Sequence, residues 1–367
     1  MRIFVTQAFL PPKEEYQAFI DKIYETNWLT NNGPLLQELE AKLKEYLGLE
    51  SLIYVSNGTI ALQLAIKSLE LSGEIITTPY SYCATTTSIL WENCKPVFVD
   101  VNSNDFNINP ELIEAKITDK TSAILATHVY GNPCDVLAIE KIAKKYSLPV
   151  VYDAAHGFNV KLNGKSLLSY GDIATCSFHA TKVFHTVEGG SISVNGNPKL
   201  AKKIWYYRSF GHVNDDYVSL GINGKNSEFH AAMGLTNLPH VEEIISKRKA
   251  IFDIYDAQLN FDHIFRPYTE QKDFEYNYAY YPVVFETKEV TDEIIAKLKE
   301  ADVFPRRYFY PSLNTLGYVN SSDKCPVSES VSHRVLSLPL FPGLPENDVI
   351  RISQIINKVL QKNGQQT

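Results

Sequence analysis

Lys182 stands at the centre of a stretch, residues 175–190, that carries several groups able to do chemistry. The apolar run that begins at Asp172 predicts a strand ending at Ser177, and a Gly-Gly pair then lets the chain turn back into a second short strand, Ser191–Val194. Lys182 is therefore expected on a tight connection between two buried strands. Burial favours a neutral amine, which is the form that Schiff-base chemistry needs. Taken alone, a lysine in a loop is far more often a solvated surface charge, and the stretches upstream favour the reactive amine.

Two other stretches supply groups that complement this lysine. In Pro149–His156 a buried apolar strand ends at Asp153, where an unpaired carboxylate would be costly. Further upstream, Gly58 and Thr59 follow a strand and open the helical run Ile60–Leu69, which leaves free backbone N–H groups for a phosphate. These three groups are the ones that pyridoxal 5′-phosphate needs, because an aspartate keeps its ring nitrogen protonated and lets the ring act as an electron sink.

These motifs resemble the DegT/DnrJ/EryC1/StrS family of nucleotide-sugar aminotransferases. The similarity runs over nearly the whole chain. A dehydratase branch of the family carries histidine at the lysine position, so this chain is similar to the transaminase branch. The matching residues are Ser177, Phe178, Thr181, Lys182, Glu188, Gly189 and Gly190 of the Ser-Phe-x-x-Thr-Lys…Glu-Gly-Gly signature, Gly58 and Thr59 of the phosphate turn, and Asp153, Ala154 and Ala155.

The resemblance implies a fold-type I, aspartate aminotransferase-like α/β fold that binds pyridoxal 5′-phosphate. It makes Lys182 the catalytic residue, Ser177 a donor to the phosphate and His156 a partner of the phenolic oxygen. An aromatic residue is expected to stack on the ring, with Tyr82 as the first choice and Tyr80 as the second. The implied cofactor-binding residues are Gly58, Thr59, Tyr82, Asp153, His156, Ser177, Lys182 and Asn223.

Asn223 is expected to act in a different subunit from the other cofactor contacts. It lies in a segment similar to the family's Gly-x-Asn segment, which reaches the cofactor phosphate of the partner subunit. The family usually has arginine and methionine where this chain has Lys225 and Asn226, so Asn226 is an alternative for this role. The resemblance therefore implies a homodimer with a shared active site.

Four further residues are implied to contact the substrate. Trp28 lies in a turn-rich loop that related enzymes place near the substrate, and His185 flanks the lysine. Tyr310 and Asn314 belong to the stretch Phe304–Asn314, whose arginines suit a diphosphate or carboxylate and whose tyrosines could stack on a base. A connector loop, a packing histidine and an aromatic core edge are the alternatives.

Composition limits the classes of function. The formal net charge of −7 and the lack of a dense basic cluster argue against a nucleic acid or a membrane surface as the main partner. Five cysteines without a CxxC pair suggest neither a disulfide framework nor a zinc site, so no bound metal is expected. No run approaches a membrane span, and the N-terminal apolar run is too short for a signal peptide. A cytoplasmic location is expected.

The 367 residues are enough for two domains. We predict a large α/β domain over residues 1–240, with a mostly parallel sheet covered on both faces, and a smaller α+β domain over residues 241–367 that begins with the long helix Val241–Leu259. Strands are expected at Leu52–Val55, Glu74–Thr77, Pro96–Val99, Ser122–Thr127 and Pro149–Tyr152, and helices at Thr59–Leu69, Ala84–Trp91, Pro110–Ala115 and Val136–Tyr146.

The resemblance implies transfer of an amino group from L-glutamate to a ketosugar linked to a nucleotide, in aminosugar and polysaccharide biosynthesis. Residues Trp28–Pro34, His156 and His185 resemble the branch that aminates C-4, so the expected substrate is dTDP-4-dehydro-6-deoxy-D-glucose. The alternative is the isomeric dTDP-3-dehydro-6-deoxy-hexose, aminated at C-3. Two more distant alternatives are dehydration without net transamination and a catalytically idle sensor of the same fold.

Overall fold

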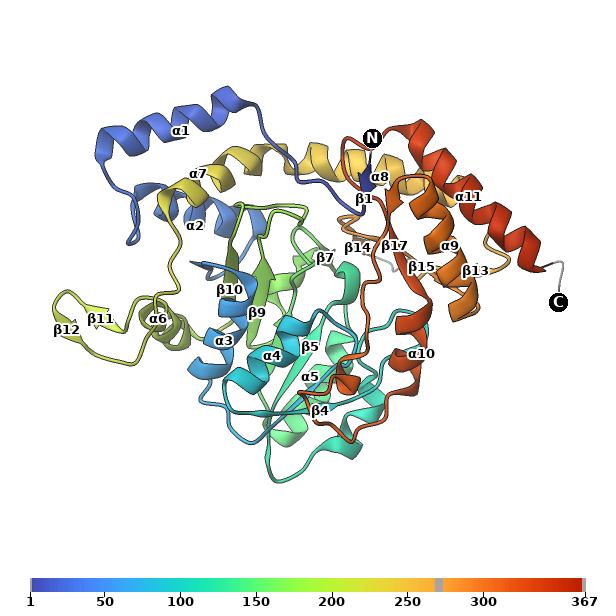
Figure 1. The fold of residues 1–367 in the computed structure, drawn as a ribbon. Coiled ribbons are helices and arrows are strands. Elements are labelled where there is room, and N and C mark those ends of the chain that lie inside the picture. The colour runs from blue at the N-terminus through green and yellow to red at the C-terminus, as the bar shows by residue number, and fades with distance from the viewer. Residues whose placement is uncertain (1, 268–272, 365–367) are drawn as a thin grey trace.

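A seven-stranded sheet forms the centre of the larger part of the chain (Figure 1). The computed structural model describes residues 2–267 and 273–364. The strands are β2 (Ile53–Val55), β3 (Glu74–Thr77), β4 (Lys95–Phe98), β5 (Thr121–Thr127), β6 (Val150–Asp153), β9 (Ile173–Ser177) and β10 (Gly190–Val194). Their order is β2-β10-β9-β6-β5-β3-β4, and β10 alone runs antiparallel to its neighbours within this sheet. The sheet is therefore mostly parallel, as the alternating pattern predicts.

Helices cover both faces of this sheet because both faces are apolar. Along β5, Ile124 and Ala126 join one buried cluster, whereas Leu125 joins the cluster on the opposite face. Successive side chains of a strand point to opposite faces, so both faces need a cover. One face is covered by α2 (Pro34–Leu47), α5 (Val136–Tyr146) and α7 (Glu228–Asn237), and the other by α3 (Gly58–Ser68), α4 (Cys83–Trp91) and α6 (Pro198–Tyr207); α1 (Lys13–Thr26) packs against α7.

The C-terminal part builds a second core around a three-stranded antiparallel sheet, with β15 between β13 and β17. A separate two-stranded sheet brings the N-terminal end of the chain to this part, since β1 pairs in parallel with β16. We retain the division at residue 240 as a proposal, with β1 lying on the smaller part. The elements are β1 (Ile3–Phe4), α8 (Val241–Gln258), β13 (Ile264–Phe265), β15 (Tyr281–Phe285), α9 (Lys288–Glu300), β16 (Val303–Phe304), α10 (Pro326–Arg334), β17 (Val335–Leu338) and α11 (Glu346–Gly364).

One predicted helix is wrong. Residues 110–115 form two short 3₁₀ turns, Pro110–Leu112 and Glu114–Lys116, instead of an α-helix. The segment is too short to offset the cost of helix nucleation, and Ile113 is its one fully buried side chain. The remaining small strands are β7 (Lys161–Leu162), β8 (Lys165–Ser166) and β14 (Phe274–Glu275), which form one sheet, and β11 (His212–Val213) and β12 (Asp216–Tyr217), which form a hairpin.

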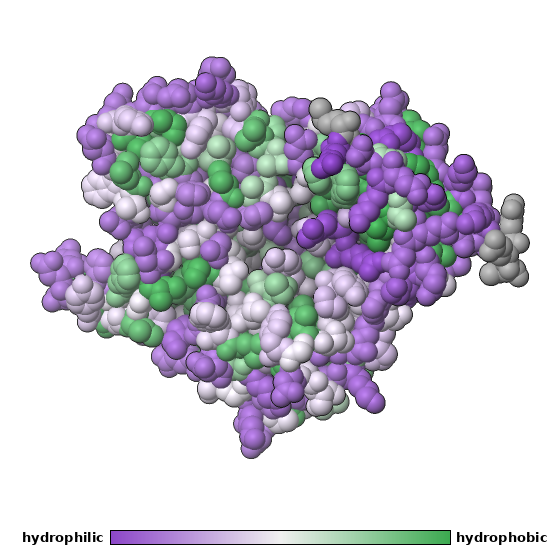
Figure 2. All heavy atoms as spheres, viewed as in Figure 1, coloured by the Kyte–Doolittle hydropathy of each residue, from purple (hydrophilic) through white to green (hydrophobic). Residues whose placement is uncertain are grey.

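Hydrophilic residues cover much of the face seen in Figure 2. Across the described ranges, 2–267 and 273–364, no helix combines the length and the apolar character that crossing a membrane requires.

Candidate active site

A cavity of about 430 Å³ lies beyond the carboxyl ends of β6 and β9, which is where ligands of parallel sheets bind. Its walls come from both parts of the chain, because the aromatic side chains of Tyr280, Tyr308 and Phe309 close it from the C-terminal side. The structure brings seven of the predicted cofactor residues together around it: Gly58, Thr59, Tyr82, Asp153, His156, Ser177 and Lys182.

The N-terminus of α3 presents backbone N–H groups to this cavity. Asn57 is the N-cap, and its side chain accepts a hydrogen bond from the N–H of Ile60 (2.8 Å). The N–H groups of Gly58 and Thr59 belong to the first turn, which has no intrahelical acceptors. A Cβ atom on Gly58 would lie 3.1 Å from Cβ of Ser177, so glycine lets the helix approach the end of β9. The turn and the serine together form a cradle for an anion.

Asp153 ends β6 with a buried carboxylate. Its Oδ2 accepts a hydrogen bond from the Thr85 hydroxyl (2.7 Å), and its Oδ1 accepts one from the Ala155 N–H (3.1 Å). Burial raises the pKa of Asp153, while these hydrogen bonds and the charge of Lys182 oppose the rise. A cationic group that enters the cavity against this carboxylate would favour the ionised form.

Lys182 lies on the connection between β9 and β10, as predicted. Its Nζ donates to the hydroxyl of Tyr280 (3.3 Å), and its backbone N–H donates to the carbonyl of His179 (2.9 Å). A Cβ atom on Gly190 would lie 2.7 Å from the carbonyl carbon of Asn57. Glycine therefore allows β10 to pass directly against the N-cap of α3, which holds the lysine connection and the anion cradle side by side.

His156 is a buried neutral imidazole in the cavity wall. Its Nδ1 accepts a hydrogen bond from the backbone N–H of Tyr130 (3.2 Å), so the neutral ring carries its proton on Nε2. Burial, followed by the charge of Lys182, lowers the pKa of His156 well below its ordinary value. The ring stacks on Phe309, with centroids 5.5 Å apart, and meets Tyr280 edge-on. These contacts give His156 a fixed orientation.

Comparison with known proteins agrees with this geometry. The pattern of the DegT/DnrJ/EryC1/StrS aminotransferase family matches residues 12–357. The chain belongs to this family. It is 40% identical to dTDP-4-amino-4,6-dideoxy-D-glucose transaminase of Shigella dysenteriae, over 97% of this chain and 99% of that one, and 39% identical to the Escherichia coli enzyme of the same name, over 96% and 97%. A crystal structure of DesI in the presence of its TDP-sugar product superposes with a TM-score of 0.92 and 28% identity, covering 100% of this chain and 96% of that one.

Of the two candidate stacking residues, Tyr82 lines the cavity and Tyr80 does not. Tyr82 is the N-cap residue of α4, is more than half exposed and lines the cavity. Tyr80 is fully buried, and its hydroxyl is hydrogen-bonded to that of Tyr130 (2.7 Å). Stacking by Tyr82 stays a prediction, whereas Tyr80 is not available to a ligand.

Two residues that were predicted to contact the substrate do not line the cavity. His185 is buried, and its Nε2 is hydrogen-bonded to the carbonyl of Phe9 (2.7 Å) while Asn237 donates to its backbone carbonyl (2.9 Å). Asn314 is also buried and donates to Glu329 Oε1 (2.7 Å). Both side chains are buried with polar atoms hydrogen-bonded inside this chain, and neither lines the cavity. Their contact with the substrate stays a prediction.

Three other predicted residues lie on the surface, away from the cavity wall of their own chain. Trp28 and Tyr310 are each about half exposed, and Asn223 is exposed and accepts a hydrogen bond from Lys225 (2.9 Å). Their proposed roles stay predictions. The alternative residue Asn226 is buried and donates to the carbonyl of Glu188 (2.7 Å), so it is not free to reach a second subunit.

Four residues at the site were not given roles of their own from the sequence. Thr85 holds the Asp153 carboxylate, and Tyr280 holds the Lys182 amine. Tyr308 and Phe309 complete the wall. A hydroxyl residue in the first turn of a helix after a strand was a weak signal for Thr85. No local pattern marks Tyr280, whereas Tyr308 and Phe309 lie in the stretch Phe304–Asn314 that was expected near the substrate. All three reach the cavity through the packing of the C-terminal part on the sheet.

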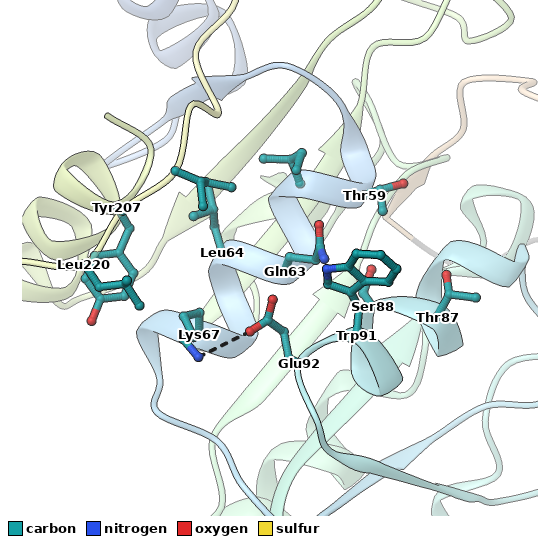
Figure 3. Close-up of a pocket in the computed structure, with 13 residues that line it drawn as sticks. Thr59, Gln63, Leu64, Lys67, Thr87, Ser88, Trp91, Glu92, Tyr207 and Leu220 are labelled. Carbon is teal, nitrogen blue, oxygen red and sulfur yellow. Dashed lines mark ion pairs between the residues drawn. The ribbon is translucent and has the colours of Figure 1, made fainter. Parts of the chain in front are cut away.

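A larger groove, of about 610 Å³, lies on the outer side of α3 and α4 (Figure 3). Its lining is mostly apolar and includes the exposed side chains of Trp91 and Leu220. The ion pair between Lys67 and Glu92 (3.6 Å) lies along its floor. Thr59, in the first turn of α3, lines both this groove and the active-site cavity.

Proposed function

We propose that this protein transfers the amino group of L-glutamate to C-4 of dTDP-4-dehydro-6-deoxy-D-glucose, giving dTDP-4-amino-4,6-dideoxy-D-glucose and 2-oxoglutarate. The observation that carries the proposal is the 40% identity to the Shigella dysenteriae transaminase over nearly the full length of both chains. The cavity adds the lysine, the buried carboxylate and the anion cradle that the chemistry needs.

The cavity residues fit pyridoxal 5′-phosphate. The anion cradle of Gly58, Thr59 and Ser177 would hold the phosphate, Asp153 the protonated ring nitrogen, and Lys182 the carbonyl carbon. When bound, the cofactor supplies a conjugated ring that accepts the electron pair left after a C–H bond next to the amino group breaks. Burial raises the pKa of the Asp153 carboxyl, so a cationic partner would stabilise its ionised form.

The protein groups orient the substrates and move protons. Lys182 Nζ takes the proton from the α-carbon of L-glutamate in the first half-reaction and delivers a proton to C-4 of the sugar in the second. Tyr280 restricts the amine through the 3.3 Å hydrogen bond. His156 offers a donor of fixed tautomer, because its Nδ1 is occupied by the N–H of Tyr130. The two substrates use one cavity in turn, so ping-pong kinetics are expected.

The proposal includes a homodimer with a shared active site. The groove of Figure 3 is mostly apolar and shares Thr59 with the phosphate cradle. The loop beside it exposes Phe210, Leu220 and Ile222 just before Asn223. Figure 2 shows hydrophobic residues gathered on this face. A second copy that covered this surface would bring Asn223 to the partner's cradle.

The test incubates the purified protein with pyridoxal 5′-phosphate, L-glutamate and, separately, the 4-keto and the 3-keto isomers of the dTDP-6-deoxyhexose. Mass spectrometry and proton NMR locate the nitrogen in the product. Amination of the 4-ketosugar at C-4, with loss of turnover in Lys182→Ala, is the expected result. Turnover restricted to the 3-ketosugar would move the protein to the C-3 reaction, and a product without nitrogen would refute transamination.

A further inference from the structure

Two neighbouring arginines lie on opposite sides of the segment that follows β16. The backbone of Arg306 is fixed to β17, because its N–H donates to the carbonyl of Ser337 (3.3 Å) and its carbonyl accepts from the N–H of Ser337 (2.8 Å). Successive side chains in an extended segment point in opposite directions. Arg307 accordingly forms an ion pair with Asp292 of α9, whereas Arg306 lies beside Tyr308, with its guanidinium carbon 5.8 Å from the centre of that ring.

Tyr308 connects Arg306 to the reactive amine. Its ring forms part of the cavity wall and packs edge-on against Tyr280, whose hydroxyl binds Lys182 Nζ. Burial raises the pKa of Tyr308, and the positive charges of Arg306 and Lys182 both oppose that rise. The phenol therefore lies within the electrostatic reach of both cations.

Within residues 2–267 and 273–364, the guanidinium of Arg306 forms no ion pair with an acidic side chain, whereas its neighbour Arg307 pairs with Asp292. The residue is exposed, so its charge costs little in the free protein. A planar guanidinium recognises a carboxylate or a phosphate through two parallel N–H···O hydrogen bonds. A guanidinium that has no acidic partner and lies next to the hydroxyl of a tyrosine in the cavity wall is suited to an anionic substrate.

We propose that Arg306 binds an anionic oxygen group of a substrate in the active-site cavity and is a specificity-determining residue for the proposed transamination, on which this inference rests. The group is either a carboxylate of the amino donor or the diphosphate of the nucleotide sugar. Each substrate enters in its own half-reaction, so measuring the two half-reactions separately shows which of the two anionic groups Arg306 binds.

The experiment compares the wild-type holoenzyme with Arg306→Gln, Arg306→Lys and the control Arg307→Gln. The control removes the same charge one residue away, from a guanidinium that faces Asp292. Stopped-flow absorbance follows the half-reaction with L-glutamate and, separately, the half-reaction with the dTDP-ketosugar. Titration calorimetry measures binding of glutarate and of dTDP alone, which is a readout independent of turnover, and melting curves verify that each variant is folded.

Arg306→Gln is expected to weaken the binding of one substrate by about 10- to 100-fold, the usual effect of losing hydrogen bonds to a charged group. Arg306→Lys is expected to weaken this binding less. If the half-reaction with L-glutamate and the binding of glutarate are both weakened, Arg306 binds the carboxylate of the amino donor. If the half-reaction with the ketosugar and the binding of dTDP are both weakened, it binds the diphosphate. Unchanged constants in both halves, or equal losses in Arg307→Gln, would overturn the inference. A wild-type protein that fails with both substrates would instead refute the proposed function.

Discussion

The burial of Asp153 lowers the folding stability at neutral pH and places a carboxylate where a cationic ligand could bind. Burial raises the pKa of Asp153 in the folded protein above its value in the unfolded chain. The folded state then holds the proton more tightly, so the contribution of this group to stability falls as the pH rises through the interval between the two pKa values. At neutral pH the ionised carboxylate is a cost that a cationic cofactor ring would offset.

Asp153→Asn is therefore expected to raise the unfolding free energy of the cofactor-free protein at pH 7 by the order of 1 kcal/mol, while transamination falls by about 10²-fold or more. Urea unfolding at several pH values and a coupled glutamate assay measure the two effects. The difference in stability between variant and wild type should vanish at acid pH, where the wild-type carboxyl is protonated. If Asp153→Asn raised the unfolding free energy by the same amount at every pH, ionisation of Asp153 would not be the cause.

Tyr280 acts on the lysine through one hydroxyl group, which makes its role separable from packing. Tyr280→Phe removes the 3.3 Å hydrogen bond to Lys182 Nζ and keeps the ring contacts with His156 and Tyr308. We expect kcat to fall by about 10-fold, with a changed pH profile and an unchanged melting temperature. Tyr280→Ala should lose stability as well. An identical kcat–pH profile for Tyr280→Phe and the wild type would exclude positioning by the hydroxyl.

At the scale of elements, one buried arginine joins three segments around the active site. Arg208 follows α6, is fully buried, and donates to Glu40 of α2 (2.5 Å), to the carbonyl of Tyr54 in β2 (2.7 Å) and to Asn32 (3.2 Å). Removing one partner of a buried ion pair leaves the other charge uncompensated, which typically costs about 3–5 kcal/mol. Arg208→Met should lower the unfolding free energy by that order in urea denaturation.

The double variant Arg208→Met with Glu40→Gln is the control for this prediction. Because the glutamine has no charge to leave uncompensated, part of the lost stability should return. Strictly additive losses in the two single variants would show that the ion pair does not link α6 to α2.

Local patterns predicted the elements around the lysine well, for a physical reason. Buried parallel strands need continuous apolar runs, and these locate β5, β6 and β9 in the sequence as in the structure. The short segment 110–115 failed because its one fully buried residue, Ile113, does not make an amphipathic face. His185 does not line the cavity although it is close to Lys182 in sequence, because sequence proximity does not set the direction of a side chain; its Nε2 is hydrogen-bonded to the carbonyl of Phe9.

At the scale of the whole molecule, the active site depends on how the two ends of the chain meet. β1 pairs with β16, and the segment after β16 brings Tyr308 and Phe309 to the cavity. Such contacts join residues about 300 positions apart, so no sequence window contains them. The predicted lysine, aspartate and phosphate turn were within reach of local patterns, whereas the aromatic wall required the tertiary arrangement.

The exposed apolar loop that includes Leu220 is expected to lie in the interface of the proposed dimer. Leu220→Asp places a charge on the exposed apolar loop that borders the groove, three residues before Asn223. Burying that charge without a partner is unfavourable, so the dimer dissociation constant should rise by at least 10-fold in sedimentation experiments. Activity should fall on dilution more steeply than in the wild type, since the partner's cradle would lose Asn223.

Leu137→Asp is the matched control, because this exposed leucine lies on α5, which covers the opposite face of the sheet. It makes the same change of side chain and charge at a site that the groove does not include. Equal weakening of the dimer by both variants would place the interface elsewhere. A wild-type protein that is monomeric and active at every concentration would refute the shared site, because each chain would then bind the phosphate with its own cradle alone.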